Sequence, residues 1–254
     1  NLYMSGMYTW VRAVEITRMD WRSIWTAWNL RSTIRDSYFH DAIGEYCHSL
    51  GYAVTLSLQS SANLVENNVF DHVCYSAVVF GGAMGNVIGY NYTGTTEYSF
   101  GADWLVAAYG SHGAHPTYNL WEGNVGNKFY EDFIHGSASH EVLFRNFLRG
   151  EQAGRVDANI AIGFEERNTR MNVIGNVLGV MGHPVVYEQR APGPFDTWMP
   201  TIFWLGDPDD TEVAGTLLRR ANYDFFHNCV WDDMAGACMD AASIDAAALP
   251  ASLY

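Results

Sequence analysis

Lysine is almost absent from this chain. The 14 basic residues are 13 arginines and the single Lys128, against 28 acidic residues, which gives a net charge of −14. A surface this acidic repels phosphate backbones and argues against a nucleic-acid partner. No apolar run reaches roughly 18 residues, the length that spans a bilayer, so no membrane insertion is expected.

Segments with helical composition are also few. Only Ile16 to Leu30 and the alanine-rich residues 234–250 have it, and the second is predicted to be a helical cap at one end of the fold. With 48% apolar residues, residues 1–254 can bury a core as a single domain. Because Asn1 is neither a start methionine nor part of a signal peptide, we expect a fragment of a longer chain.

Seven short segments repeat one pattern around a polar residue. An apolar residue stands three positions before this anchor and another directly after it. The anchors are Ser37, Asn68, Asn91, Asn124, Asn146, Asn176 and Asn228. Their intervals are 31, 23, 33, 22, 30 and 52 residues, which indicates a step near 22 with added loops, and two turns in the last interval.

The repeat favours strands, because β-branched and aromatic residues surround each turn residue. Asparagine tolerates the left-handed conformation, and its amide can both donate and accept between coils about 4.8 Å apart. The consensus of leucine-rich repeats is missing. The sequence therefore predicts an all-β fold, a single parallel β-helix (a solenoid) with an Asn ladder and long loop insertions.

Several repeat units resemble right-handed parallel β-helix proteins of the pectate-lyase-like superfamily. The units Asn63–Phe70, Tyr118–Asn124 and His140–Asn146 show this best, and the similarity covers roughly residues 31–230. The resemblance implies carbohydrate recognition, since the superfamily includes polysaccharide lyases, glycoside hydrolases, epimerases, esterases and phage tailspikes. The motifs Asn-Thr-Asp with Asp-Asp and Gly-His-Gly, of polygalacturonase-like hydrolases, and Trp-Ile-Asp-His, of pectate lyases, are absent.

Candidate catalytic residues come from equal offsets to the anchors, because equivalent positions on successive coils are neighbours in space. Eleven positions before the anchor lie His135 and Glu165, and six before it lie His140 and Arg170. Imidazole, carboxylate and guanidinium together suit proton abstraction beside a sugar carboxylate, or acid/base cleavage of a glycosidic bond. We expect His135 to be the acid/base, Glu165 its partner, and Arg170 and His140 to hold the sugar.

Candidate substrate contacts lie nearby. They are His112, His115, Asp103, Trp104, Glu166 and Tyr187. Four insertions are expected to wall a cleft if they leave the coil at one corner. These are Asp41 to Tyr52, Thr93 to Thr117, Gly150 to Asn159 and Met181 to Met199.

Structural roles compete with each assignment. A single histidine more often serves a turn or the surface than catalysis, and only one of Glu165 and Glu166 can face the His135 column. Arg170 can instead pair with Glu141 or Glu166. His112 and His115 are a weak metal pair, and no metal site is assigned to them.

Two further motifs are weak. Asp132, His135 and Ser137 hold the residue types of a catalytic triad, but the Gly-x-Ser-x-Gly elbow is absent. The loop from Asp207 to Glu212 is oxygen-rich and is a candidate for Ca²⁺, although it lacks the spacing of an EF-hand. No pattern requires a cofactor.

Four cysteines give an even count. They are compatible with Cys47–Cys74 and Cys229–Cys238 bridges, but three pairings are open, and Cys229 can also be a buried thiol. We expect an extracellular or cell-surface protein. The leading functional hypothesis is a polysaccharide lyase or glycoside hydrolase that cleaves a glycan in a loop-walled groove. The alternatives are a noncatalytic glycan-binding module of tailspike or adhesin type and a structural surface or filament subunit.

Overall fold

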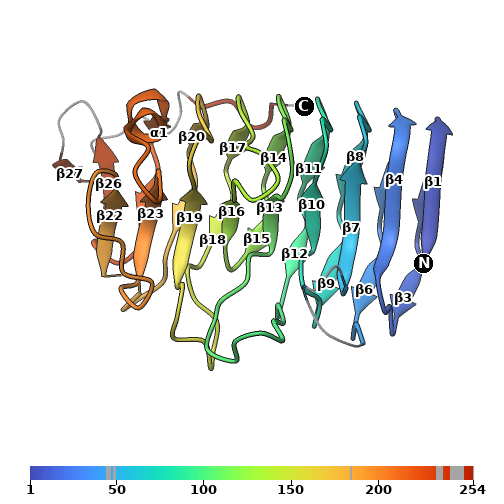
Figure 1. Ribbon diagram of the computed structural model, residues 1–254, viewed down its shortest axis with the longest axis horizontal. Coiled ribbons are helices and arrows are strands. Elements are labelled where there is room, and N and C mark those ends of the chain that lie inside the picture. Colours follow the sequence, from blue (N-terminus) through green and yellow to red (C-terminus); the bar gives the residue numbers. More distant parts are fainter. Residues whose placement is uncertain (44–46, 48–49, 184, 233–236, 241–248, 254) are drawn as a thin grey trace.

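A computed structural model describes residues 1–43, 47, 50–183, 185–232, 237–240 and 249–253. Within them the chain passes repeatedly, in the same order, through three sheets named here A, B and C. Figure 1 shows the strands stacked along one axis, from β1 at one end to β22, β26 and β27 at the other. This arrangement is all-β and is consistent with the parallel β-helix that the repeat predicts.

Sheet A contains nine strands of the described chain. In spatial order they are β1 (Leu2–Met7), β4 (Arg22–Leu30), β7 (Tyr52–Ser57), β10 (Ala77–Val79), β13 (Tyr109–Ser111), β16 (Phe129–Glu131), β19 (Ile160–Phe164), β23 (Thr201–Leu205) and β22 (Val186–Arg190).

Sheet B contains eight strands of the same residues. In spatial order they are β2 (Trp10–Arg12), β5 (Thr33–Arg35), β8 (Leu64–Glu66), β11 (Val87–Gly89), β14 (Leu120–Glu122), β17 (Val142–Phe144), β20 (Asn172–Ile174) and β24 (Leu218–Arg220).

Sheet C contains ten described strands. They are β3 (Glu15–Thr17), β6 (Tyr38–His40), β9 (Val69–Asp71), β12 (Tyr92–Thr93), β15 (Val125–Gly126), β18 (Phe147–Leu148), β21 (Val177–Leu178), β25 (Tyr223–Asp224), β26 (Cys229–Asp232) and β27 (Ala237–Met239). The pairs β25–β26 and β26–β27 are antiparallel, whereas the other sheet pairs are parallel.

The predicted Asn ladder is confirmed for six of its seven anchors. Ser37 N donates to Asn68 Oδ1 at 3.1 Å. From there each amide Nδ2 donates to the next Oδ1, at 3.0 Å from Asn68 to Asn91, 3.0 Å from Asn91 to Asn124, 3.0 Å from Asn124 to Asn146 and 2.9 Å from Asn146 to Asn176. These bonds satisfy buried polar groups at every step between circuits.

The seventh anchor was predicted wrongly. Asn176 Nδ2 donates to Asn222 Oδ1 at 3.0 Å, 46 residues on, whereas Asn228 Oδ1 accepts from Tyr223 Oη at 2.6 Å. The interval holds one circuit and the additional strand β22, and not two circuits.

A second ladder lies five residues before the first, and sequence analysis missed it. It joins Ser32, Asn63, Asn86 and Asn119 and ends where Asn119 Nδ2 donates to Glu141 Oε1 at 2.8 Å. The amide series thus ends on a carboxylate inside the core.

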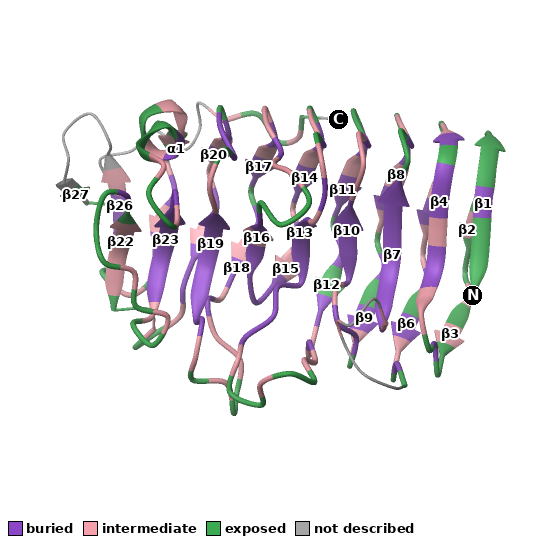
Figure 2. Ribbon diagram, in the orientation of Figure 1, coloured by how far each residue is buried: buried purple, intermediate pink, exposed green. Residues whose placement is uncertain are grey.

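The residues three before the anchors form the core, as predicted, up to the last circuit. Ile34, Val65, Ile88, Trp121, Leu143 and Val173 are buried. In the last circuit Arg219 pairs with Val173 in this row, and the predicted Phe225 is 39% exposed. The apolar residues just after the anchors point outward, since Tyr38, Val69 and Tyr92 are 38 to 50% exposed. Figure 2 shows the buried residues concentrated in the central strands and β1 largely exposed.

The helix predicted from Ile16 to Leu30 is wrong, because this segment contains the end of β3 and all of β4. Strand β4 pairs with both β1 and β7, so partners on two sides override the weak local helical preference. The described chain has one helix, α1 (Thr211–Thr216), capped by Asp210. Of the predicted cap at 234–250, Ala237–Met239 is the strand β27, and residues 234–236 and 241–248 lie outside the described residues.

Both disulfides that the cysteine count allowed are present, Cys47–Cys74 and Cys229–Cys238. The cysteines therefore do not include a free Cys229 thiol. Three of the four expected insertions leave at the same corner, since those after β6, β12 and β18 all connect sheet C to sheet A, although the one after β12 ends where β13 begins. Two of these three form the long loops at the lower edge of Figure 1. The fourth, Met181 to Met199, is not a loop throughout, because it contains the strand β22.

Candidate functional site

The outer face of sheet A carries a row of aromatic and titratable side chains where its strands end. Register pairs Val79 with Ser111, Ser111 with Glu131, and Glu131 with Phe164. Because successive strand residues alternate between faces, the residues that follow these inward positions lie on the outer side. They are Phe80, His112, Asp132 and Glu165.

His112 and Asp132 form a tight pair. His112 Nδ1 lies 2.5 Å from Asp132 Oδ2, and Asp132 Oδ1 accepts from Ile134 N at 3.1 Å. An ionised carboxylate only accepts hydrogen bonds, so Nδ1 of a neutral His112 carries the hydrogen. Its Nε2 lone pair forms no hydrogen bond with the described residues and is available to accept a proton.

His135 lies beside this pair, on the turn that follows Asp132. It is exposed, and its ring centroid is 4.8 Å from that of His112, edge to face. Both histidines line a cavity of about 280 Å³ with Arg22, Trp25, Phe80 and neighbouring residues. The predicted neighbourhood of His135 and His112 is therefore present.

Arg22 is the cation of this cavity. Its guanidinium carbon lies 5.0 to 5.9 Å from the ring centroids of Trp21, Trp25, Tyr52 and Phe80. Burial lowers the pKa of Arg22, although an arginine keeps its charge at any neutral pH. Within the described residues Arg22 forms no ion pair, and its buried Nε has no hydrogen-bond partner.

Glu165 stacks on Asp132 and not on His135. The pairing of Glu131 with Phe164 places it there, so the predicted alignment is displaced by three residues. Tyr130 Oη donates to Glu165 Oε1 at 2.6 Å, and Phe133 N donates to Oε2 at 3.2 Å. Burial, followed by the charge of Asp132, raises the pKa of Glu165, although the bond from Tyr130 opposes the shift. Glu165 thus holds the turn that carries His135.

Lys128 is buried next to Tyr130, the residue that donates to Glu165. Its Nζ donates to Leu105 O at 3.3 Å and Ala158 O at 3.2 Å, and it sits 4.2 Å from the Tyr130 ring centroid. Burial lowers the pKa of Lys128 to about 7. It packs against the Tyr130 ring and is 2% exposed, which keeps it from a substrate.

Asp103 and Trp104, predicted as substrate contacts, line a second cavity of about 360 Å³. Tyr98, Phe100, Asp157 and Trp198 complete most of its wall. Tyr98 packs against the same buried cluster as Phe80, which lines the first cavity. The insertions thus wall the end of sheet A opposite to His135.

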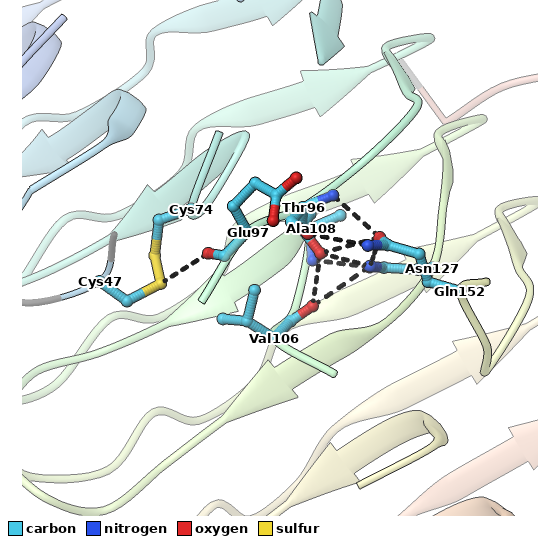
Figure 3. The surroundings of a disulfide bond; sticks show 8 residues. All are labelled: Cys47, Cys74, Thr96, Glu97, Val106, Ala108, Asn127 and Gln152. Carbon is cyan, nitrogen blue, oxygen red and sulfur yellow. Dashed lines mark hydrogen bonds between the residues drawn. A yellow bond between two sulfur atoms is a disulfide. The ribbon is translucent and has the colours of Figure 1, made fainter. Parts of the chain in front are cut away.

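A hydrogen-bond network fixes the insertion that carries Asp103 and Trp104. Gln152 Nε2 donates to Thr96 O at 2.8 Å, and Gln152 Oε1 accepts from Thr96 N at 2.9 Å. Figure 3 shows this network beside the Cys47–Cys74 disulfide, whose Cys47 Sγ lies 3.6 Å from Glu97 O. Hydrogen bonds therefore hold this wall of the second cavity in place.

His140 and Arg170 stack on successive circuits, as predicted, because Ser139 pairs with Thr169. They precede sheet B, however, and neither is among the described residues that line the two cavities. Arg170 instead approaches Glu212 at 4.0 Å.

Three other candidates also lie outside the two cavities. His115 is exposed, and its N donates to Ser137 O at 3.0 Å. Glu166 pairs with Arg167 at 2.9 Å. Tyr187 stacks on Trp231, 4.0 Å between ring centroids, at the far end of the core.

The described residues contain no group of three or more His, Cys, Asp or Glu placed to hold a metal ion. In the loop that was a Ca²⁺ candidate, Asp210 instead accepts from Glu212 N at 2.9 Å and from Arg167 N at 2.8 Å. No described helix has the length and apolar content to cross a membrane.

Sequence analysis did not assign Arg22, Tyr130 or Lys128 to the site, and it named Asp132 only within a weak triad. Arg22 lay in a segment interpreted as helix, which hid its strand register. Asp132 could have been found by counting from the strand, since it follows Glu131 at the end of β16 as His112 follows Ser111 at the end of β13.

Comparison with known proteins gives no relative: no family model, curated protein or solved structure matches this chain.

Proposed function

We propose that the protein cleaves a uronic-acid polysaccharide by β-elimination in the cavity lined by Arg22, His112 and His135. The observation that carries this proposal is Arg22, a cation without a carboxylate partner among the described residues, in a chain of net charge −14. Acidic side chains outnumber basic ones, yet this arginine is held among four aromatic rings and faces two histidines. Its natural partner is an anion from outside.

Each of the three side chains has a role in one step of the elimination. Arg22 neutralises the sugar carboxylate, which makes the proton on the adjacent C5 more acidic. His112 Nε2, with Nδ1 fixed by Asp132, removes this proton. The electron pair forms the C4–C5 double bond, the C4–O bond breaks, and protonated His135 gives its proton to the leaving oxygen.

Elimination is favoured over hydrolysis by the state of the two carboxylates. Both oxygens of Asp132 accept hydrogen bonds, from His112 and Ile134, so Asp132 orients a base and is poorly placed as a nucleophile. Glu165 is likewise held by Tyr130 and Phe133. We assign Glu165 to positioning the turn of His135.

The wider setting supports this choice. Stacked parallel sheets with Asn ladders fit the right-handed β-helix of the pectate-lyase-like superfamily, to which we propose that the chain belongs. Two disulfides fit a secreted or cell-surface protein, because such bonds persist in oxidising compartments.

The test is a panel of acidic and neutral polysaccharides, with products followed by ultraviolet absorbance and mass spectrometry. Elimination gives an unsaturated end and a fragment lighter by one water than the hydrolytic product. We expect activity on a uronan, and losses of about 10²-fold or more in His112→Ala, Asp132→Asn and Arg22→Ala.

His115→Ala is the matched control, since this exposed histidine belongs to the same turn as His112 but does not line the cavity. It should retain activity and the wild-type circular dichroism spectrum. Saturated products, or equal losses in His115→Ala and His112→Ala, would refute elimination here. Binding without any cleavage would instead support a noncatalytic glycan-binding module.

A further inference from the structure

The proposed reaction does not use the residues that line the second cavity. Four aromatic rings line it: Tyr98, Phe100 and Trp104 from the insertion between β12 and β13, and Trp198 from the segment between β22 and β23. Phe100 and Trp198 are 56% and 58% exposed, so their rings are accessible to a ligand. Tyr98 and Phe100 meet edge to face at 5.7 Å, so their faces are turned in different directions.

The charges around these rings are negative. Asp103 and Asp157 line the cavity, and no basic residue does so in the described chain. Asp157 Oδ1 is buried and accepts no hydrogen bond from the described residues. Aromatic faces attract cations, and the two carboxylates reinforce this attraction.

The nearby cations are already engaged. Arg155 Nη2 pairs with Glu97 Oε2 at 2.8 Å, and its Nη1 donates to Ala102 O. Lys128 lies 5.6 Å from the Trp104 ring centroid, and burial lowers its pKa to about 7, so it is only partly charged at neutral pH. Neither group lines the cavity.

We infer that this cavity binds an amino sugar through its protonated amine, with the sugar ring against Trp104 or Trp198. A volume of about 360 Å³ is at the small end of ligand sites and suits one sugar unit. A uronate or sulfated sugar would be repelled by Asp103 and Asp157. The sugar identity rests on the proposed glycan function, whereas the preference for a cation rests on the cavity alone.

The experiment is titration calorimetry with a glucosamine oligomer and an N-acetylglucosamine oligomer of equal length, at about pH 6, where the amine is protonated. The protein carries His112→Ala, so cleavage plays no part, and failure of the elimination proposal leaves this result unaffected. We expect the free-amine oligomer to bind about tenfold more tightly, less so at high salt.

Asp103→Asn and Trp198→Ala should each weaken binding of the amine oligomer several-fold. Asp209→Asn, an exposed change of equal charge outside the cavity, is the control and should leave binding unchanged. Equal or tighter binding of the N-acetylated oligomer would overturn the inference. The same holds if Asp209→Asn weakens binding as much as Asp103→Asn, since attraction to the general acidic surface would then explain it.

Discussion

Glu131 and Glu141 should make this fold less stable as the pH rises from about 4.5 to about 7. Both carboxyl groups are fully buried in the core. Glu141 accepts from Trp121 Nε1 at 2.7 Å and from Asn119 Nδ2 at 2.8 Å, whereas neither oxygen of Glu131 has a hydrogen-bond partner in the described chain.

Burial raises the pKa of Glu141 to about 7, and burial with the charge of Glu141 raises the pKa of Glu131 well above its usual range. A raised carboxyl pKa means that the folded state binds the proton more tightly than the unfolded state. Each such group therefore lowers the free energy of unfolding by about 1.4 kcal/mol per pH unit between its unfolded and folded pKa values. For Glu141 alone the loss by pH 7 is about 3 kcal/mol.

The assay is urea denaturation of wild type and Glu131→Gln at several pH values between about 4.5 and 7.5. Glutamine keeps the shape of the protonated acid and cannot ionise. The variant should match wild type near the acidic end and become increasingly more stable than wild type as the pH rises, by up to about 1.4 kcal/mol per pH unit, because the cost of keeping Glu131 protonated is gone.

Glu212→Gln, on a side chain that is 59% exposed, is the matched control and should follow the wild-type curve. Comparison of variants cancels the titrating groups that do not interact with Glu131, since these act equally in both proteins. The reasoning would be refuted if wild type and Glu131→Gln differed by a constant amount across the whole pH range, since the effect would then be packing and not ionisation.

Three further outcomes follow from buried groups elsewhere. Asn91→Ala removes four ladder hydrogen bonds and should lower the free energy of unfolding by about 2–4 kcal/mol in urea denaturation. Replacing Cys47 and Cys74 by serine should cost about 2–4 kcal/mol, and added reductant should reproduce this loss in wild type but leave the variant unchanged. Lys128→Met should stabilise the protein at pH 7 by on the order of 4 kcal/mol, because the folded state lowers the lysine pKa to about 7 and wild type must give up this proton or bury the charge. Wild type regains the lost stability as the pH rises from about 7 to the pKa of lysine in the unfolded state, so thermal unfolding near pH 7 and pH 10 would show the difference between the two proteins shrinking.

The sequence predicts the ladder well because a buried amide recurs at one position of each circuit, although the left-handed conformation that was expected of the anchors belongs to the residue before each of them. Asn67, Tyr90 and Arg145, each just before an anchor, have φ of 53°, 55° and 54°. Such a constraint is local, so it leaves a readable pattern. The rule failed at Asn222 because it requires an apolar residue three positions earlier, where Arg219 stands. That arginine is allowed in the core row because Glu188 pairs with it at 2.5 Å.

The site could not be predicted in the same way. Each anchor lies in the turn between sheets B and C, so offsets from it run backward through a strand of sheet B and the turn between sheets A and B. The structure determines which residues of that turn remain in register. Glu165 aligns with Asp132 because both directly follow a strand of sheet A, and His135 lies three residues further into the turn.

Counting from the ends of the sheet A strands would have aligned His112, Asp132 and Glu165, but this count requires knowing where β13, β16 and β19 end. Arg22 was still harder to predict from the sequence. Its position depends on the pairing of β4 with β7, where Arg22 lies opposite Tyr52, and the residues near it in sequence carry no sign of this contact. A cation whose surroundings come from Tyr52 and Phe80 is fixed by long-range pairing. The functional residues of such a fold are therefore found by strand register and not by local motif.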